Sequence, residues 1–249
     1  MHLVGDSTLG FDTRAVHAGQ PPDPATGAVV TPISLATTFA QEGVGGHRGY
    51  EYSRSGNPTR AALEACLASL ESARHGLAYA SGLAAEDSVL RLVPSGGRVV
   101  LGNDAYGGTF RLIDKVWGPY GLRWTAVDLT DVDALAAGWP EGTAMVWLET
   151  PTNPLLSCID IAAVCEVAHR LGALVVVDNT FATPYLQQPI ALGADIVVHS
   201  ATKYLGGHSD VVGGFLAVDD DGVADRLRFT QNAAGAVPGR STATSCCAA

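Results

Sequence analysis

Charged residues are scarce in this 249-residue chain, and the basic ones are the scarcer: 15 Lys and Arg stand against 25 Asp and Glu, a net charge of −10. Nucleic acid and anionic membrane surfaces would repel such a chain, so we expect neither as a partner. No apolar run approaches the roughly 20 residues that cross a bilayer, and the first ten residues lack the pattern of a signal peptide. We therefore expect a cytoplasmic protein with a small-molecule ligand.

Cysteine is also sparse, and its positions exclude two kinds of scaffold. The five cysteines are odd in number and lack paired zinc-ligand spacing: Cys66, Cys158, Cys165, Cys246 and Cys247. We expect reduced thiols, with Cys66 and Cys165 packed in the core. Hydrophobic residues make up 47% of the chain, which is enough to bury a large core and argues against disorder.

Short apolar runs alternate with helical patterns along most of the chain. Segments typical of strands are 97–102, 122–129, 144–150, 173–180 and 194–200. Their almost continuous β-branched character indicates strands buried on both faces, hence an α/β fold with a mostly parallel sheet. Helices are expected between them, at 109–121, 161–172 and 185–193.

The region before the first strand divides into two parts. Residues 1–50 contain scattered Gly and Pro and indicate an extended arm that lies against a partner subunit. Asn57 and Pro58 begin a helix as cap and first residue, and an apolar stripe follows. We divide the chain into an arm (1–58), a ligand-binding domain (59–239) and a tail (240–249) in which hydrophobic periodicity stops.

Polar residues follow several of the predicted strands. Glu149, Asp178 and Ser200 each close an apolar strand. In a parallel sheet a ligand binds beyond the carboxyl ends of the strands, so these residues mark a candidate site.

Lys203 follows the last of these strands and precedes a glycine pair, so we expect its amine to enter the crevice instead of bulk water. There it could attack an aldehyde, with Ser200 and Thr202 offering hydroxyl groups to a phosphate. The alternative is a surface lysine in a polar turn.

Asp178 favours the first interpretation, because a buried carboxylate needs a cationic partner. The ring nitrogen of pyridoxal phosphate is such a partner, and a carboxylate opposite it keeps that nitrogen protonated. A helix cap or a metal ligand is the alternative, although His199 and His208 alone do not complete a metal site.

The sequence signals for residues that could contact a phosphate or a planar ring are weaker. Gly82 and Leu83 open a helical pattern, where backbone N–H groups can bind a phosphate. Tyr106 could lie over a planar ring. Tyr52 and Arg54, two residues apart in an extended segment, point to one side, and Arg54 could pair with a phosphate.

Taken together, the segments YSRSGNPTR, DAYGGTF, ETPTNP, VDNTF and HSATKYLGGHSDVVGG resemble the Cys/Met-metabolism family of pyridoxal-phosphate enzymes, and in detail its bacterial cystathionine γ-synthases. The resemblance covers residues 11 to about 239. It implies the type I fold of pyridoxal-phosphate enzymes, like that of aspartate aminotransferase, and assembly as a homotetramer built from two dimers.

The resemblance also implies a role for each matching residue. Lys203 would hold the cofactor as a Schiff base, Asp178 would face the ring nitrogen, and Tyr106 would stack on the ring. The phosphate would be bound by Gly82, Leu83, Ser200 and Thr202, with Tyr52 and Arg54 reaching into the neighbouring subunit's phosphate site. Asn153 would lie near the phenolic oxygen of the cofactor and the substrate.

The implied reaction is replacement of the acyl group of an O-acylhomoserine by cysteine to give cystathionine, a step of methionine biosynthesis. Cystathionine γ-lyase, methionine γ-lyase and O-acetylhomoserine sulfhydrylase share these motifs and stay as alternatives. A nucleotide-binding oxidoreductase is disfavoured, since no Gly-rich strand-to-helix turn is found.

The tail departs from the family pattern. Family members continue into a smaller C-terminal domain that carries an arginine for the substrate carboxylate, and we expect that domain to be missing here. The last residues, RSTATSCCAA, fit a frameshift. An inactive truncated fragment is therefore a further alternative.

Overall fold

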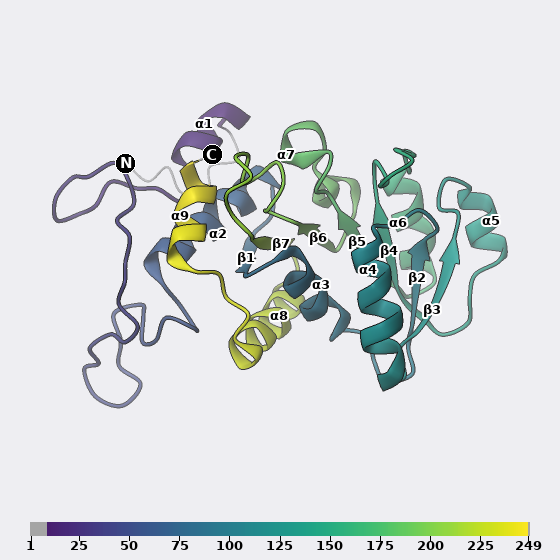
Figure 1. Cartoon of the computed structure of the whole chain (residues 1–249), viewed down its shortest axis with the longest axis horizontal. Helices are drawn as coiled ribbons and strands as arrows, with labels where there is room; N and C mark the ends of the chain where they lie inside the picture. Colours follow the sequence, from purple (N-terminus) through teal and green to yellow (C-terminus); the bar gives the residue numbers. More distant parts are fainter. Residues whose placement is uncertain (1–8, 249) are drawn as a thin grey trace.

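Seven apolar strands organise the part of the chain that the computed structural model describes, residues 9–248 (Figure 1). The strands are β1 (His75–Tyr79), β2 (Arg98–Gly102), β3 (Arg123–Val127), β4 (Thr143–Glu149), β5 (Leu174–Asp178), β6 (Ile196–His199) and β7 (Gly214–Val218). Their order across the sheet is β1-β7-β6-β5-β4-β2-β3. Strand β7 pairs antiparallel with both β1 and β6, and the other pairs are parallel. The predicted α/β fold with a mostly parallel sheet is confirmed.

All five predicted strands are present as β2 to β6, whereas β1 and β7 were not predicted. Both have a Gly at or near the start and few β-branched residues. Residues 1–8 of the predicted arm and residue 249 of the predicted tail lie outside the described part.

Helices cover both faces of the sheet. The helices and helical turns are α1 (Phe11–His17), α2 (Pro58–Leu70), α3 (Gly82–Leu90), α4 (Gly107–Arg111), η1 (Leu112–Trp117), η2 (Gly118–Tyr120), α5 (Val132–Ala137), α6 (Ile161–Arg170), α7 (Thr183–Leu186), η3 (Pro189–Leu192), α8 (Asp221–Ala234) and α9 (Arg240–Ala248). Because successive strand residues point to opposite faces, Trp147 packs toward α3 and α8 while its neighbour Leu148 packs toward α5 and α6.

The start of α2 matches the prediction, since the Asn57 side chain accepts hydrogen bonds from the backbone N–H groups of Thr59 and Arg60. The single helix predicted over 185–193 was wrong. The chain forms two separate turns there, α7 and η3, because Pro189 cannot donate a hydrogen bond within a continuing helix.

The two ends of the described chain also hold helices that were not predicted. Helix α1 lies within the expected arm, and residues 19–56 then run in extended form away from the sheet (Figure 1). Helix α9 packs beside α2, with Ala243 and Cys246 buried three residues apart on one face. The expectation that periodicity stops after residue 239 was therefore wrong.

Between residues 9 and 248, no helix is both long enough and apolar enough to cross a membrane.

Candidate functional site

A cavity of about 300 Å³ opens at the carboxyl ends of β4, β5 and β6. It is lined by Ser81, Gly82, Leu83, Glu86, Tyr106, Glu149, Asn153, Asp178, Thr180, Phe181, Ser200, Thr202, Lys203 and Val212. Eight of the ten residues predicted for the site meet here, and the exceptions are Tyr52 and Arg54.

The amino end of α3 forms one wall of the cavity. The Ser81 side chain caps the helix by accepting a hydrogen bond from the Ala84 N–H at 3.1 Å. A Cβ atom on Gly82 would lie 3.0 Å from both Cα and Cβ of Ser200, so glycine lets the helix begin directly against Ser200. The first N–H groups of a helix have no partners within it, and those of Gly82 and Leu83 are thus available to an anion.

Asp178 ends β5 and is only 6% exposed. Its Oδ1 accepts a hydrogen bond from the Thr180 N–H at 2.9 Å. Burial raises the pKa of Asp178, while Thr180 and the nearby His199 act in the opposite direction. A cationic group in the cavity would offset the cost of burying this carboxylate.

Two further carboxyl groups line the same cavity: Glu149, which the sequence marks at the end of a predicted strand, and Glu86, which was not predicted. Burial, together with the neighbouring Asp178, raises the pKa of Glu86 to about 8 and that of Glu149 to about 8. Glu149 Oε2 accepts a hydrogen bond from the Tyr106 N–H at 2.9 Å. Glu86 lies four residues after Gly82, on the same face of α3, and this helical spacing was the available signal.

Lys203 lies in the turn after β6 and reaches the cavity, but it is exposed. The shelter from bulk water expected from its position is thus absent in the single chain. Thr202 fixes the turn, since its Oγ1 accepts from the Gly213 N–H at 3.1 Å and donates to the Gly213 carbonyl at 3.2 Å.

Tyr106 and Asn153 stand at the mouth of the cavity. Tyr106 precedes α4, and its ring packs over Gly108, where a Cβ atom would lie 2.3 Å from the ring. Asn153 belongs to the loop after β4, which is tied to the neighbouring loop by a hydrogen bond from the Leu155 N–H to Asp104 at 3.1 Å.

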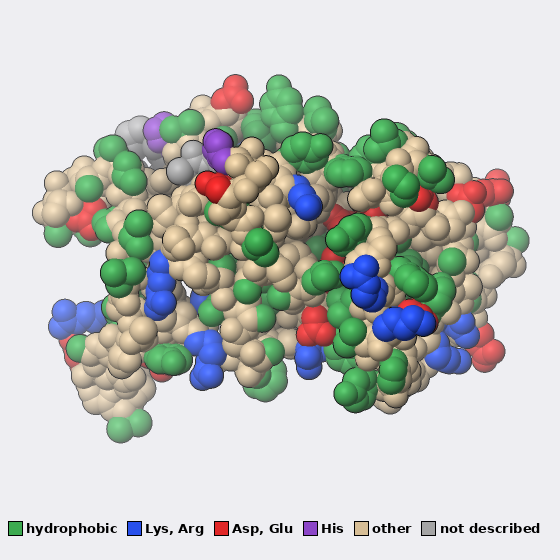
Figure 2. Space-filling model, in the orientation of Figure 1, with side chains coloured by type: hydrophobic (Ala, Val, Ile, Leu, Met, Phe, Trp, Pro, Cys, Tyr) green, Lys and Arg blue, Asp and Glu red, His purple; other side chains and the backbone are tan. Residues whose placement is uncertain are grey.

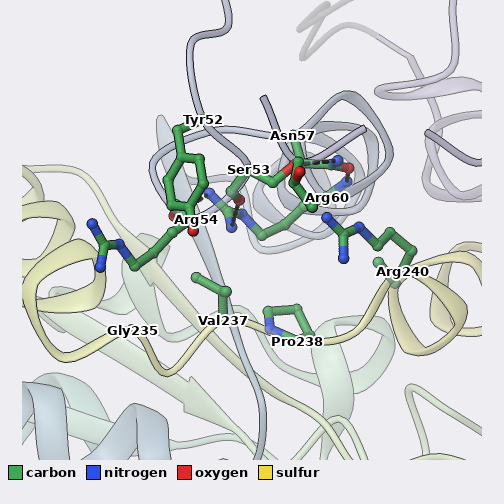
Figure 3. Close-up of a pocket in the computed structure, with 11 residues that line it drawn as sticks. Tyr52, Ser53, Arg54, Asn57, Arg60, Gly235, Val237, Pro238 and Arg240 are labelled. Atoms are coloured by element: carbon green, nitrogen blue, oxygen red, sulfur yellow. Dashed lines mark hydrogen bonds between the residues drawn. The ribbon is translucent and has the colours of Figure 1, made fainter. Parts of the chain in front are cut away.

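Tyr52 and Arg54 line a different pocket, of about 230 Å³, between the arm and the segment joining α8 to α9 (Figure 3). The buried Arg60 side chain donates hydrogen bonds to the carbonyl groups of Ser53, Arg54 and Ser55 and so fixes the shape of the segment. Arg54 is exposed, with Nε donating to Asn232 Oδ1 at 3.2 Å. The structure therefore does not bring these two residues to Lys203.

The cavity fits pyridoxal phosphate. Its aldehyde needs a primary amine (Lys203), its phosphate an N–H-rich site (Gly82 and Leu83) and its ring nitrogen a carboxylate (Asp178). The buried carboxyl group of Asp178 makes this part of the cavity favourable for a cationic ring. Such a fold with such a site defines a pyridoxal-phosphate-dependent enzyme.

The chain belongs to the Cys/Met metabolism family of PLP-dependent enzymes, whose model matches residues 12–247. This confirms the family and the cofactor inferred from the sequence motifs. The family works in transsulfuration, and its members carry the names of several different reactions.

Curated relatives include a probable cystathionine γ-synthase of Herpetosiphon aurantiacus, 54% identical over 92% of this chain and 72% of its own length. The cystathionine γ-synthase of Mycobacterium bovis is 57% identical, over 92% of this chain and 60% of its own length. A cystathionine β-lyase of Coxiella burnetii is 51% identical, over 91% of this chain and 59% of its own length.

Solved structures give the same result. The chain superposes on metB from Corynebacterium glutamicum with a TM-score of 0.94 and 48% identity, over 97% of this chain and 63% of that one. For cystathionine γ-lyase from Lactobacillus plantarum, complexed with L-serine, the TM-score is 0.93 at 46% identity, over 96% and 63%. The chain thus spans roughly three fifths of most of these relatives.

Proposed function

We propose that this chain is the cofactor-binding part of an enzyme that replaces the acyloxy group of an O-acylhomoserine by the sulfur of cysteine, giving cystathionine. The observation that carries the proposal is the convergence of Lys203, Asp178 and the amino end of α3 on one cavity. The reaction is taken from the two relatives named cystathionine γ-synthase, at 54% and 57% identity.

Pyridoxal phosphate, when bound, supplies a protonated ring that withdraws electrons from the substrate Cα. Asp178 keeps the proton on the ring nitrogen, and Tyr106 covers the ring. Lys203 takes the proton from Cα and returns one later. The Cγ–O bond breaks and the acyloxy group leaves as a carboxylate, and the cysteine sulfur, which gives up its thiol proton, forms the new bond at Cγ. Asn153 orients the substrate.

We also propose that the chain works in a homo-oligomer, a dimer of dimers, in which Tyr52 and Arg54 complete the phosphate site of a neighbouring copy. Their pocket is separate from Lys203, and the Arg54 side chain is exposed. Hydrophobic side chains gather on the surface over α7 (Figure 2), where Tyr185 and Leu186 are 70% and 76% exposed. Apolar surface of this kind favours a protein partner.

The first experiment concerns the cofactor and uses the two lysines of the chain, Lys115 and Lys203. We expect the purified protein with added pyridoxal phosphate to show the visible absorption of a lysine-bound cofactor, which borohydride reduction fixes to Lys203. Lys203→Ala should lose this absorption. Lys115→Ala is the matched control, because Lys115 forms a surface ion pair with Asp114 at 2.7 Å, and it should keep the absorption.

The reaction is tested on the loaded protein by supplying cysteine with O-succinylhomoserine or O-acetylhomoserine. Formation of cystathionine supports the proposal. Release of an α-keto acid from cystathionine or methionine would instead support elimination, as in the relatives named β-lyase and γ-lyase. A loaded protein with neither activity would be an inactive fragment.

A further inference from the structure

A buried polar network lies directly behind the cofactor cavity, and the proposed reaction does not use it. Its centre is Glu71, which ends α2 and is 1% exposed. Glu71 Oε1 accepts a hydrogen bond from Asn179 Nδ2 at 2.8 Å and is also hydrogen-bonded to His199 Nε2. Neither Asn179 nor His199 is exposed to solvent, at 0% each.

The two partners of Glu71 are sequence neighbours of two cavity residues. Asn179 follows Asp178, and His199 precedes Ser200. Successive residues of an extended chain point to opposite sides, so Asp178 and Ser200 face the cavity while Asn179 and His199 face α2. One carboxylate oxygen therefore fixes the ends of β5 and β6 from behind.

The network continues to a third strand. Gln187 Nε2 donates hydrogen bonds to Asn179 Oδ1 at 2.9 Å and to the Thr150 carbonyl at 3.1 Å. Thr150 follows Glu149, another cavity residue. The network thus joins the ends of β4, β5 and β6, each one residue away from a side chain that lines the cavity.

Burial of the Glu71 carboxyl group costs free energy. A buried carboxyl group has to be held by good hydrogen bonds, and the cost is recovered only when the partners are in place. Such a group tolerates little displacement of the strand ends that supply the donors. This rigidity is what a site needs when its residues must stay within about 0.5 Å of the productive geometry.

We propose that Glu71 is a positioning residue of the cofactor site, which acts through Asn179 and His199 on Asp178 and Ser200. The inference rests on binding of the family's cofactor in this cavity and not on which transsulfuration reaction follows. It assigns to α2 a role in the site although no residue of α2 lines the cavity.

The test is Glu71→Gln, which keeps the size of the side chain and an oxygen that can accept from Asn179 and His199. It replaces the carboxylate by a neutral amide, which weakens both hydrogen bonds, and it places a buried NH2 group where Oε2 has no partner among the described residues. We expect affinity for pyridoxal phosphate to fall about tenfold, the lower end of what loss of an outer-shell partner costs at metal sites. The absorption spectrum of the bound cofactor should also change, because Asp178 and the ring nitrogen no longer align.

Thr143→Val is the control, since it removes a buried hydrogen bond, from Thr143 Oγ1 to the Pro140 carbonyl at 2.6 Å, at the opposite end of β4. It should leave the affinity and spectrum as in the wild type. Gln187→Met removes only the outer link and should weaken binding about threefold, and it carries the test if Glu71→Gln does not fold.

Unchanged affinity and spectrum in Glu71→Gln, or in Gln187→Met where that variant carries the test, would overturn the inference while leaving the cofactor assignment intact. An equal loss in Thr143→Val would overturn it too, because the effect would then be one of general stability. A wild-type chain that binds no pyridoxal phosphate would overturn both the inference and the proposed function.

Discussion

The two pockets that hold the predicted site residues are built in different ways. The cavity around Lys203 lies on the ends of three neighbouring strands and on the start of α3, so the sheet itself fixes most of its walls. The pocket around Arg54 is lined by the arm and by the segment after α8. The walls of the first come from the sheet and α3 of this chain, whereas the second presents Tyr52 and Arg54, which we propose act on the cofactor site of a neighbouring copy.

The arm pocket still has a defined shape, and Arg60 explains it. This buried arginine binds three successive backbone carbonyl groups of residues 53–55 and leaves the side chains of Tyr52 and Arg54 on the outside. Residues 53–55 therefore have a backbone conformation that Arg60 fixes, while the exposed side chains of Tyr52 and Arg54 lack the other groups that a cofactor site needs.

The largest effect should come from the carboxylate that defines the first pocket. Asp178→Asn removes the charge opposite the ring nitrogen, and loss of one partner from a buried ionic contact weakens binding by about thirtyfold or more. Titration with pyridoxal phosphate measures the affinity. An affinity within twofold of wild type would show that the ring does not face Asp178.

A smaller effect should follow from filling the contact between α3 and Ser200. Gly82→Ala places a Cβ atom 3.0 Å from the Ser200 backbone, so the helix has to shift, and overpacking of this kind costs about 1 to 3 kcal/mol. We expect cofactor affinity to fall about tenfold. Gly107→Ala is the matched control, because a Cβ atom there has no neighbour within 4 Å, and it should bind as wild type.

Mixing two variants tests whether the second pocket serves another copy. Arg54→Ala should weaken cofactor binding about fivefold, as expected for one exposed charge-assisted contact. Co-expressed with Lys203→Ala, it should form mixed assemblies in which half of the sites regain both residues and wild-type affinity. If the mixture shows no regained affinity, Arg54 does not act across an interface.

The last effect concerns the stability of the cofactor-free protein and its dependence on pH. Burial raises the pKa of Glu86 from 4.5 to about 8, so the folded chain holds a proton that the unfolded chain releases above 4.5. Stability should therefore be greatest below 4.5 and fall as the pH rises to about 8, by at most about 1.4 kcal/mol per pH unit for this group.

Glu86→Gln should flatten this dependence. The free energy of unfolding, measured by urea denaturation between pH 5 and pH 8.5, is the observable. A slope equal to that of wild type would show that Glu86 ionises freely in the folded chain.

The sequence predicted the core of the fold because β2, β4, β5 and β6 have nearly continuous apolar runs that are buried on both faces. Strand β3 was predicted to be buried in the same way, but it lies at the edge of the sheet and is only partly buried. Strands β1 and β7 carried less signal, since HGLAY and GFLAV each contain a Gly and few β-branched residues, although most of their side chains are buried in the core. Contacts with residues distant in the chain determine whether such segments form strands.

The candidate site was predictable where a motif stands at a strand end, as at Asp178, Ser200 and Lys203. Glu86 had only its helical spacing from Gly82 as a signal, and Glu71 had none, because a carboxyl group on or beside a helix ordinarily faces solvent and only the packing shows that these two are buried. Arg54 and Lys203 line different pockets, and this too could not be predicted, because the path of the arm does not follow from any periodic pattern in its sequence.

The reversed strand β7 has a consequence for how the chain folds. Its pairing with β6 joins residues close in sequence, but its pairing with β1 joins His75 to Val218, across most of the described chain. Contacts between distant residues form slowly, and domains fold as the chain emerges during synthesis. Strand β1 is thus the first of the seven strands to be synthesised, and its hydrogen-bonding groups stay unpaired until β7, the last strand, has been synthesised.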